Sequence, residues 1–162
     1  MEEQKKTVIP MEGQPIAQPL WAFKVCRIKD GVEHQGHDVI MDKSWYVIGR
    51  RFLLDRKVFD GERKVLNDSI RSVSRENAYL IVKEDKIYVQ YYQEQGHSKA
   101  LIRINGWQLE EGRSYALKPG DVFRLGNTLD GDRERCVEFT MYRLTEAAGT
   151  DGAQAPRVQP PI

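Results

Sequence analysis

The sequence predicts an all-β fold, an antiparallel sandwich or barrel of about ten short strands. Short apolar runs recur along the middle of the chain at intervals of about 8–12 residues, which is the spacing of sandwich and barrel strands. Turn-forming glycine, proline and asparagine residues separate these runs. No segment shows the sustained apolar spacing of a helix, apart from a short turn expected within residues 52–66.

The first half of the chain supplies five of these runs. At residues 21–26, apolar side chains recur at every second position, and Val39 and Met41 follow the same period. Residues 45–48 form a continuous apolar run that ends at Gly49. The runs 78–82 and 87–91 flank the charged sequence at 83–86, which is typical of a hairpin turn.

The second half of the chain supplies four more runs, each with a turn signal beside it. Residues 101–104 end at Asn105-Gly106, a strong tight-turn pair. Residues 115–117 lead to a Pro-Gly turn at 119–120, and residues 122–125 end at a Gly-Asn pair. In the last run, 136–144, one face is apolar and consists of Val137, Phe139 and Met141.

Length and composition indicate one ordinary globular domain. The 162 residues include 40% apolar and 30% charged side chains, and the formal net charge is only +1. No apolar run approaches the roughly 20 residues that cross a bilayer, and the N-terminal sequence lacks the apolar stretch of a secretory signal. We therefore expect a cytoplasmic protein that does not bind membranes, with Cys26 and Cys136 as buried thiols.

The same composition divides the chain into three parts. Residues 1–18 show no periodicity and are expected to form a flexible N-terminal arm. Residues 145–162 are rich in Ala, Gly and Pro and are expected to form a disordered tail. The folded domain is expected to span residues 19–144, with an enlarged loop at about residues 51–68.

Three short phrases lie at the ends of apolar runs, where loops should begin. They are Gly49-Arg50, Ser74-Arg75 and the turn pair Asn105-Gly106. Any one of them alone is usually a solvated strand end or an ordinary turn. An arginine presents a planar fork that grips two phosphate oxygens, and a serine hydroxyl donates to a third. Together the phrases favour a site that holds a phosphate group.

In these phrases the chain resembles a forkhead-associated (FHA) domain over roughly residues 20–144. The matching sequences are VIGR at 47–50, VSRENA at 73–78, HSKALIRING at 97–106 and LKPGDVFRLG at 117–126. The resemblance implies an antiparallel β-sandwich of about eleven strands that binds phosphothreonine peptides through loops at one end.

The resemblance also assigns roles to individual residues. It implies that Arg50 pairs with the phosphate, that Ser74 donates its hydroxyl to a phosphate oxygen, and that Arg75 adds a second contact. Ser98 and Lys99 would border the peptide. The residues that would form the supporting scaffold are Gly49, Asn77, Asn105 and Gly106, of which Asn105 and Gly106 would be turn residues that shape the sandwich.

Two positions depart from the family pattern. The family has a histidine, which braces the serine loop, where this chain has Asn77, and an asparagine amide can form some of the same hydrogen bonds. The asparagine that clamps the peptide main chain in the family corresponds to Ala100, which has no donor or acceptor in its side chain. The second departure bears on peptide affinity and not on the fold.

The segment between the first two phrases is strongly basic. Residues 50–75 contain eight Lys or Arg and four Asp or Glu, a net charge of +4 in a chain whose total is +1. Seven apolar residues lie between positions 52 and 66, so we expect the segment to be partly folded and to lie beside the binding face. A partner contact and a merely solvated loop are equally compatible with the charges.

The leading functional hypothesis is a non-catalytic module that binds phosphothreonine-containing proteins, such as a Ser/Thr kinase or its substrate. The alternative is a degenerate FHA-like domain that assembles proteins without phosphate, as Asn77 and Ala100 suggest. Nucleic-acid binding through residues 50–75 is a weaker third hypothesis, because acidic residues are interspersed there. The sequence contains no evident catalytic pair, cofactor motif or metal-ligand cluster, and the two histidines at 34 and 37 fit a surface loop.

Overall fold

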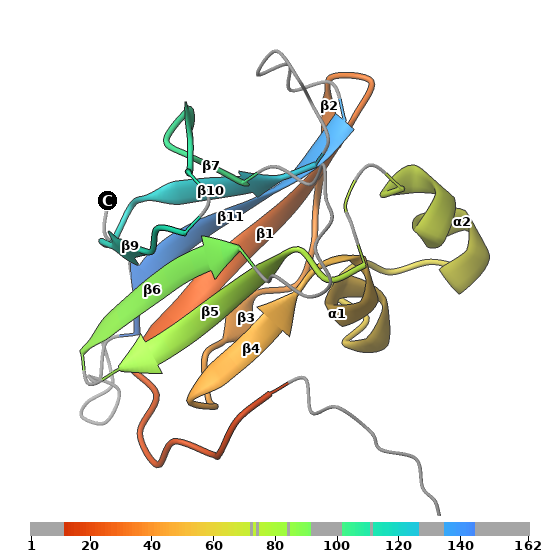
Figure 1. Cartoon of the computed structure of the whole chain (residues 1–162). Helices are drawn as coiled ribbons and strands as arrows, with labels where there is room; N and C mark the ends of the chain where they lie inside the picture. The colour runs from red at the N-terminus through yellow and green to blue at the C-terminus, as the bar shows by residue number, and fades with distance from the viewer. Residues whose placement is uncertain are drawn as a thin grey trace, which may run out of the picture.

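The chain forms a sandwich of two antiparallel β-sheets (Figure 1). The computed structural model describes residues 12–71, 73, 75–83, 85–91, 102–110, 112–126 and 135–144, without the side chain of Arg135. These residues contain eleven strands and two short helices. The predicted all-β class and the strand number implied by the FHA resemblance are therefore confirmed.

The larger sheet has seven strands in the order β2-β1-β11-β10-β7-β8, with β3 also paired to β1. Its strands are β1 (Trp21–Lys29), β2 (Val32–Gln35), β3 (Val39–Ile40), β7 (Ile102–Ile104), β8 (Trp107–Gln108), β10 (Val122–Leu125) and β11 (Arg135–Arg143). The smaller sheet has the order β4-β5-β6-β9. Its strands are β4 (Trp45–Ile48), β5 (Ala78–Lys83), β6 (Lys86–Tyr91) and β9 (Tyr115–Leu117).

The core lies between the inner faces of the two sheets. The alternation predicted for the last strand is present, because Val137, Phe139 and Met141 are all buried. Phe139 stacks on Phe123 with ring centroids 4.5 Å apart, and Phe23 meets both rings edge-on. Period-two burial on both sheets thus explains why the apolar runs of the sequence form a sandwich.

The segment expected as an enlarged loop folds into two helices, α1 (Arg50–Asp55) and α2 (Arg63–Ser69). Phe52 and Leu53 bury one side of α1, and Leu66 buries one side of α2. Helices of six and seven residues are too short to be stable alone, so this burial must hold them in place. They lie together at one end of the sandwich, where β4 ends (Figure 1).

Residues 12–16, which fall within the predicted flexible arm, are hydrogen bonded along the outer edge of β4. The amide of Gly13 donates to the carbonyl of Trp45 at 2.8 Å, and the amide of Ile16 donates to that of Asp42 at 2.8 Å. The Glu12 carboxylate lies 3.1 Å from both Lys43 Nζ and Arg56 Nη2. Residues 1–11 and the predicted tail at 145–162 lie outside the described residues, and the domain limits stay predictions.

Cys26 and Cys136 form no disulfide, and Cys136 is buried as predicted, whereas Cys26 is only half-buried. The two helices that the structure describes are both too short, and too rich in charge, to serve as a membrane span. His34 lies in β2 and His37 follows it, with His37 Nε2 2.9 Å from the Asp60 carboxylate. The described residues contain no group of three or more His, Cys, Asp or Glu arranged to hold a metal ion.

Candidate functional site

The ends of β4 and β5 bring the first two sequence phrases together. Ile48 and Ala78 are partners in the β4–β5 ladder, and the amide of Asn77 donates to the carbonyl of Ile48 at 2.9 Å. One step further, the amide of Arg51 donates to the carbonyl of Arg75 at 3.4 Å. The chain therefore leaves the sheet at Gly49, forms α1 and α2, and returns beside its starting point.

Arg50 is the first residue of α1 and is only partly exposed. Its Nη1 donates to the Asn67 side-chain oxygen on α2, at a long distance of 3.4 Å. Its Nε is buried and has no hydrogen-bond acceptor in the part of the chain that the structure describes. A buried charged donor without an acceptor is costly, so the surroundings of Arg50 lack an acceptor that this nitrogen requires.

The electrostatic surroundings of Arg50 are mainly positive. Burial lowers the pKa of Arg50 below its ordinary value, and the nearby charges of Arg75 and then Arg71 lower it further. Glu76 acts in the opposite direction and more weakly. The Glu76 carboxylate lies 3.6 Å from Arg51 Nη1, so part of its charge is already engaged.

Arg75 is exposed, and its guanidinium has no hydrogen bond or ion pair among the described residues. Like charges at close range repel one another, and an anion bound between them would offset that repulsion. Arg50 and Arg75, with Arg71 nearby, therefore form a positive cluster of the kind that binds anions such as phosphate.

Asn77, which stands in place of the family histidine, is buried, with 2% of its surface exposed. No other polar or charged residue that the structure describes is buried to this extent. Its main-chain bond to Ile48 fixes the return of the chain into β5. Asn77 thus adjoins Ala78, the first residue of β5, and its role as a support for the serine loop stays a prediction.

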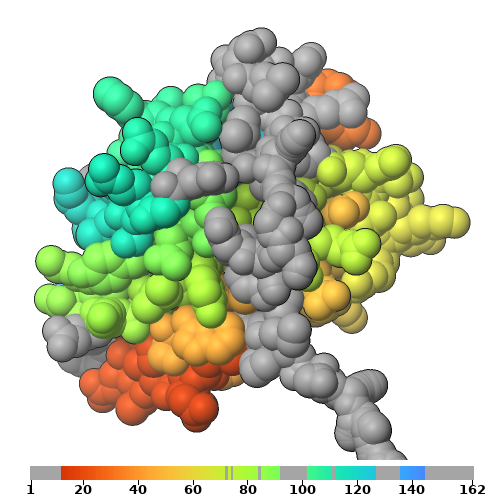
Figure 2. All heavy atoms as spheres, viewed as in Figure 1, coloured from red at the N-terminus to blue at the C-terminus, as the bar shows by residue number. Residues whose placement is uncertain are grey.

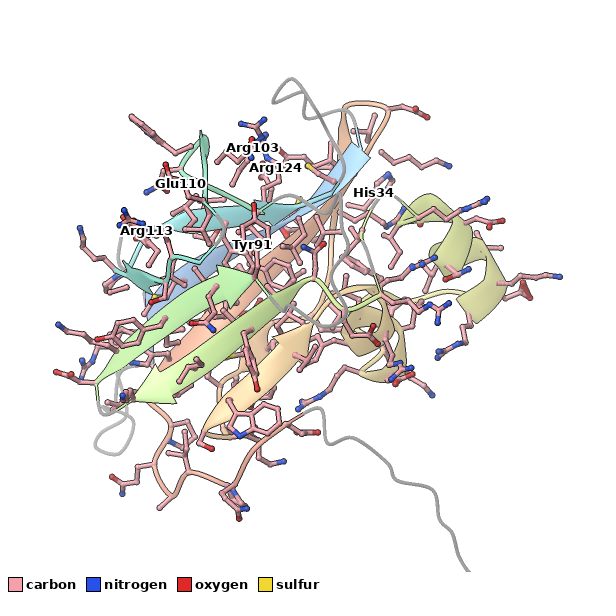
Figure 3. The ribbon with its side chains drawn as sticks, viewed as in Figure 1. His34, Tyr91, Arg103, Glu110, Arg113 and Arg124 are labelled. Atoms are coloured by element: carbon pink, nitrogen blue, oxygen red, sulfur yellow. The ribbon has the colours of Figure 1, made fainter. Side chains whose placement is uncertain are left out.

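Four residues of the predicted binding loops lie outside the described residues, namely Ser74, Ser98, Lys99 and Ala100. The structure does describe what flanks the last three. Tyr91 ends β6 and pairs with Ala78, and its hydroxyl accepts a hydrogen bond from the amide of Ile102 at 3.1 Å. Tyr91 thereby ties the end of β6 to the start of β7 (Figure 3). Both flanks of residues 92–101 are thus held at the end of the sandwich where β4 ends.

The third phrase, Asn105-Gly106, lies in a different part of the fold. Asn105 and Gly106 have positive φ angles of 50° and 90° and form the turn between β7 and β8. The Asn105 side chain donates to Asp121 at 3.0 Å and accepts from the amide of Val122 at 2.9 Å. These bonds join the β7–β8 turn to the β9–β10 turn, so Asn105 and Gly106 shape the sandwich and are not brought to Arg50.

Sequence reasoning missed three neighbours of Arg50, which are Asn67, Arg71 and Glu76. Arg71 was included only as one charge of the basic segment, and nothing in the sequence marked Asn67. The proximity of these residues to Arg50 depends on how the segment between β4 and β5 packs, and patterns of neighbouring residues in the sequence do not show that packing.

Comparison with solved structures gives the relationship of this fold. Full-length yeast Pml1p matches with a TM-score of 0.53 and 14% identity, over 86% of this chain and 100% of that chain. A second structure of yeast Pml1, described as a splicing factor integrated into the RES complex, matches with a TM-score of 0.51 and 14% identity, over 86% and 97%. The FHA1 domain of yeast Rad53 matches with a TM-score of 0.48 and 15% identity, over 88% and 91%.

The fold is FHA-like. The resemblance noted in the sequence is therefore confirmed as far as the fold is concerned. Matches at such low sequence identity support an FHA-like fold and say nothing about which ligand this protein binds. No protein-family model matches the chain, and no curated protein matches it in sequence.

Proposed function

We propose that this protein is an interaction module that binds phosphothreonine peptides at the end of the sandwich formed by Arg50, Ser74 and Arg75. The observation that carries the proposal is the position of Arg50. Its Nε is buried without an acceptor among the described residues, and two further arginines lower its pKa. A phosphate group would supply the missing acceptor and the missing negative charge.

The chemistry of the ligand fits this environment. A phosphothreonine carries a charge of about −1.5 to −2 at pH 7 and three acceptor oxygens. The Arg50 fork would take two oxygens, while Arg75 and the Ser74 hydroxyl would contact the third. Hydrogen bonds to charged groups contribute about 1.5–3 kcal/mol each, and micromolar affinity requires about 8 kcal/mol in total. Three such bonds and a few peptide contacts would reach that affinity.

The test is calorimetric titration of the full chain with a degenerate phosphothreonine peptide library and with the same library unphosphorylated. Phosphoserine and phosphotyrosine libraries define whether threonine is preferred. Binding only to the phosphothreonine set is the expected result. Equal heats from phosphorylated and unphosphorylated sets would contradict the proposal.

The alternative is a domain that assembles with a protein surface without phosphate. Two observations favour it: Ala100 replaces the family's peptide-clamping asparagine, and one Pml1 structure is described by its integration into a complex. This alternative predicts a partner that co-purifies with the protein and stays bound after phosphatase treatment. Release of the partner by phosphatase would favour the phosphothreonine hypothesis instead.

A further inference from the structure

Helix α2 presents one face toward Arg50. The hydrogen bond between Arg50 Nη1 and the Asn67 side chain fixes which face this is. Lys64 precedes Asn67 by three residues, so it lies on the same helical face, one turn away. Arg71 follows Asn67 by four residues and is close enough to Arg50 to lower its pKa. This face of the α2 segment therefore continues directly from the arginine site.

The charges on this face are available to a ligand. Lys64 is exposed, and its ammonium group has no ion pair or hydrogen bond in the described part of the chain. Arg71 lies 3.8 Å from Asp68, and both side chains are more than two-thirds exposed, at 69% and 68%. An exposed ion pair of this length contributes little, so Arg71 can exchange Asp68 for another partner. Figure 2 shows α2 and the residues after it, in yellow to yellow-green, standing out from the body of the molecule.

We propose that Lys64 and Arg71 form a subsite for acidic residues that flank the phosphothreonine on one side. This inference rests on the proposed phosphate site and adds a preference to it. The occupant is an Asp or Glu side chain of the bound peptide itself. A peptide whose phosphate lies at Arg50 must run past one of the segments beside Arg50. The α2 segment presents there the ammonium of Lys64, unpaired among the described residues, and the weakly paired guanidinium of Arg71.

Charge complementarity supports carboxylates as the occupant. Residues 50–75 carry a net charge of +4, and Lys64 and Arg71 contribute two of the positive charges, on the side of the α2 segment that Asn67 presents to Arg50. Exposed ion pairs contribute modestly and are screened by salt, so the subsite should adjust affinity and not create it. The phosphate would provide most of the binding energy, and α2 would select among phosphopeptides.

The experiment uses fluorescence anisotropy with the full chain and three phosphothreonine peptides. One has neutral flanks, one has three Asp residues before the phosphothreonine, and one has three Asp residues after it. Asn-containing peptides of the same length serve as isosteric controls. For the unaltered protein, we expect acidic flanks on one side to tighten binding by about three- to tenfold, and to do so less at high salt.

The variant is Lys64→Gln with Arg71→Gln. Its readout is the ratio of the dissociation constants of the neutral and acidic peptides, which should fall to about one. The matched control is Lys86→Gln with Lys118→Gln, which removes the same charge from two exposed lysines. Lys86 follows the β5–β6 turn and Lys118 follows β9, at the other end of the smaller sheet. This control should keep the ratio of the unaltered protein.

The outcomes separate the two proposals. Phosphate-dependent binding without a preference for acidic flanks, or a preference that survives Lys64→Gln with Arg71→Gln, would overturn the subsite alone. Absence of binding to every phosphopeptide would overturn the proposed function and the subsite with it. A preference that also disappears in the Lys86 and Lys118 control would show that total charge, and not α2, produced the effect.

Discussion

Replacing Arg50 by alanine should abolish phosphopeptide binding and leave the fold intact. In the proposed complex, Arg50 makes two charge-assisted hydrogen bonds to the phosphate. At the low end of about 1.5 kcal/mol each, their loss amounts to about 3 kcal/mol, or roughly a 150-fold weaker affinity. A dissociation constant of about 1 μM would then rise to roughly 150 μM, and a titration at micromolar protein concentration would show no binding.

The same substitution should have little effect on stability. Arg50 donates one long hydrogen bond, to Asn67 at 3.4 Å, and its removal relieves repulsion from Arg75 and Arg71. Alanine is also a favourable residue in the first turn of α1. We expect a change within about 0.5 kcal/mol, which for a domain of this size moves the melting temperature by no more than about 2 °C.

The assay pairs calorimetric titration with thermal unfolding for Arg50→Ala, Arg50→Lys and Arg113→Ala. Arg50→Lys keeps the charge but loses the fork, so its affinity should fall between those of Arg50→Ala and the unaltered protein. Arg113 is an exposed arginine, 3.7 Å from Glu110, and its replacement should leave affinity unchanged. Unchanged affinity in a folded Arg50→Ala protein would refute the assignment of Arg50.

Three further predictions concern the supports of the site and the sheet. Asn67→Ala should weaken phosphopeptide binding by about three- to tenfold in the same titration, because Arg50 loses its one described side-chain partner. Gly13→Ala should lower the free energy of unfolding by about 1–2 kcal/mol in urea, since a Cβ there would lie 2.3 Å from Ser44 Oγ; an unchanged value would mean that the edge contact of residues 12–16 adds no stability. Tyr46→Phe should cost about 1–3 kcal/mol, because the buried hydroxyl accepts from the Asp42 amide at 2.8 Å. Burial and then the Asp42 carboxylate raise the pKa of Tyr46 above its ordinary value. The contribution of Tyr46 to stability should therefore be full below about pH 10, where tyrosine ionises in the unfolded chain, and should fall at higher pH. This alkaline loss, measured as the urea midpoint against pH, should be smaller in Tyr46→Phe.

Local sequence does not predict helices α1 and α2. The segment that follows Gly49 contains apolar residues, and the sequence predicted only that it would be partly folded. α1 and α2 are six and seven residues long, so neither has enough internal hydrogen bonds to be stable by itself. They form because Phe52, Leu53 and Leu66 are buried against the rest of the molecule. That burial is a property of the folded chain.

The contact of residues 12–16 with the edge of β4 also depends on tertiary structure and not on local sequence. This stretch contains one glycine, one proline and no alternation, so its sequence predicts part of a flexible arm. The exposed edge of β4 offers unpaired main-chain groups, and Gly13 and Ile16 donate to the carbonyls of Trp45 and Asp42. A sheet edge can order a segment whose own sequence has no strand signal.

The sequence by itself determined the fold class, the positions of most strands and the order of the FHA-like phrases. It could do so because period-two burial and turn residues act over a few neighbouring positions, where sequence and structure correspond directly. Only the tertiary structure decided that Arg50, Arg71 and Arg75 share one electrostatic environment and that Asn67 contacts Arg50. These residues meet because the β4–β5 register returns the chain to Arg50 after α1 and α2 have packed, and register and packing depend on contacts between distant residues.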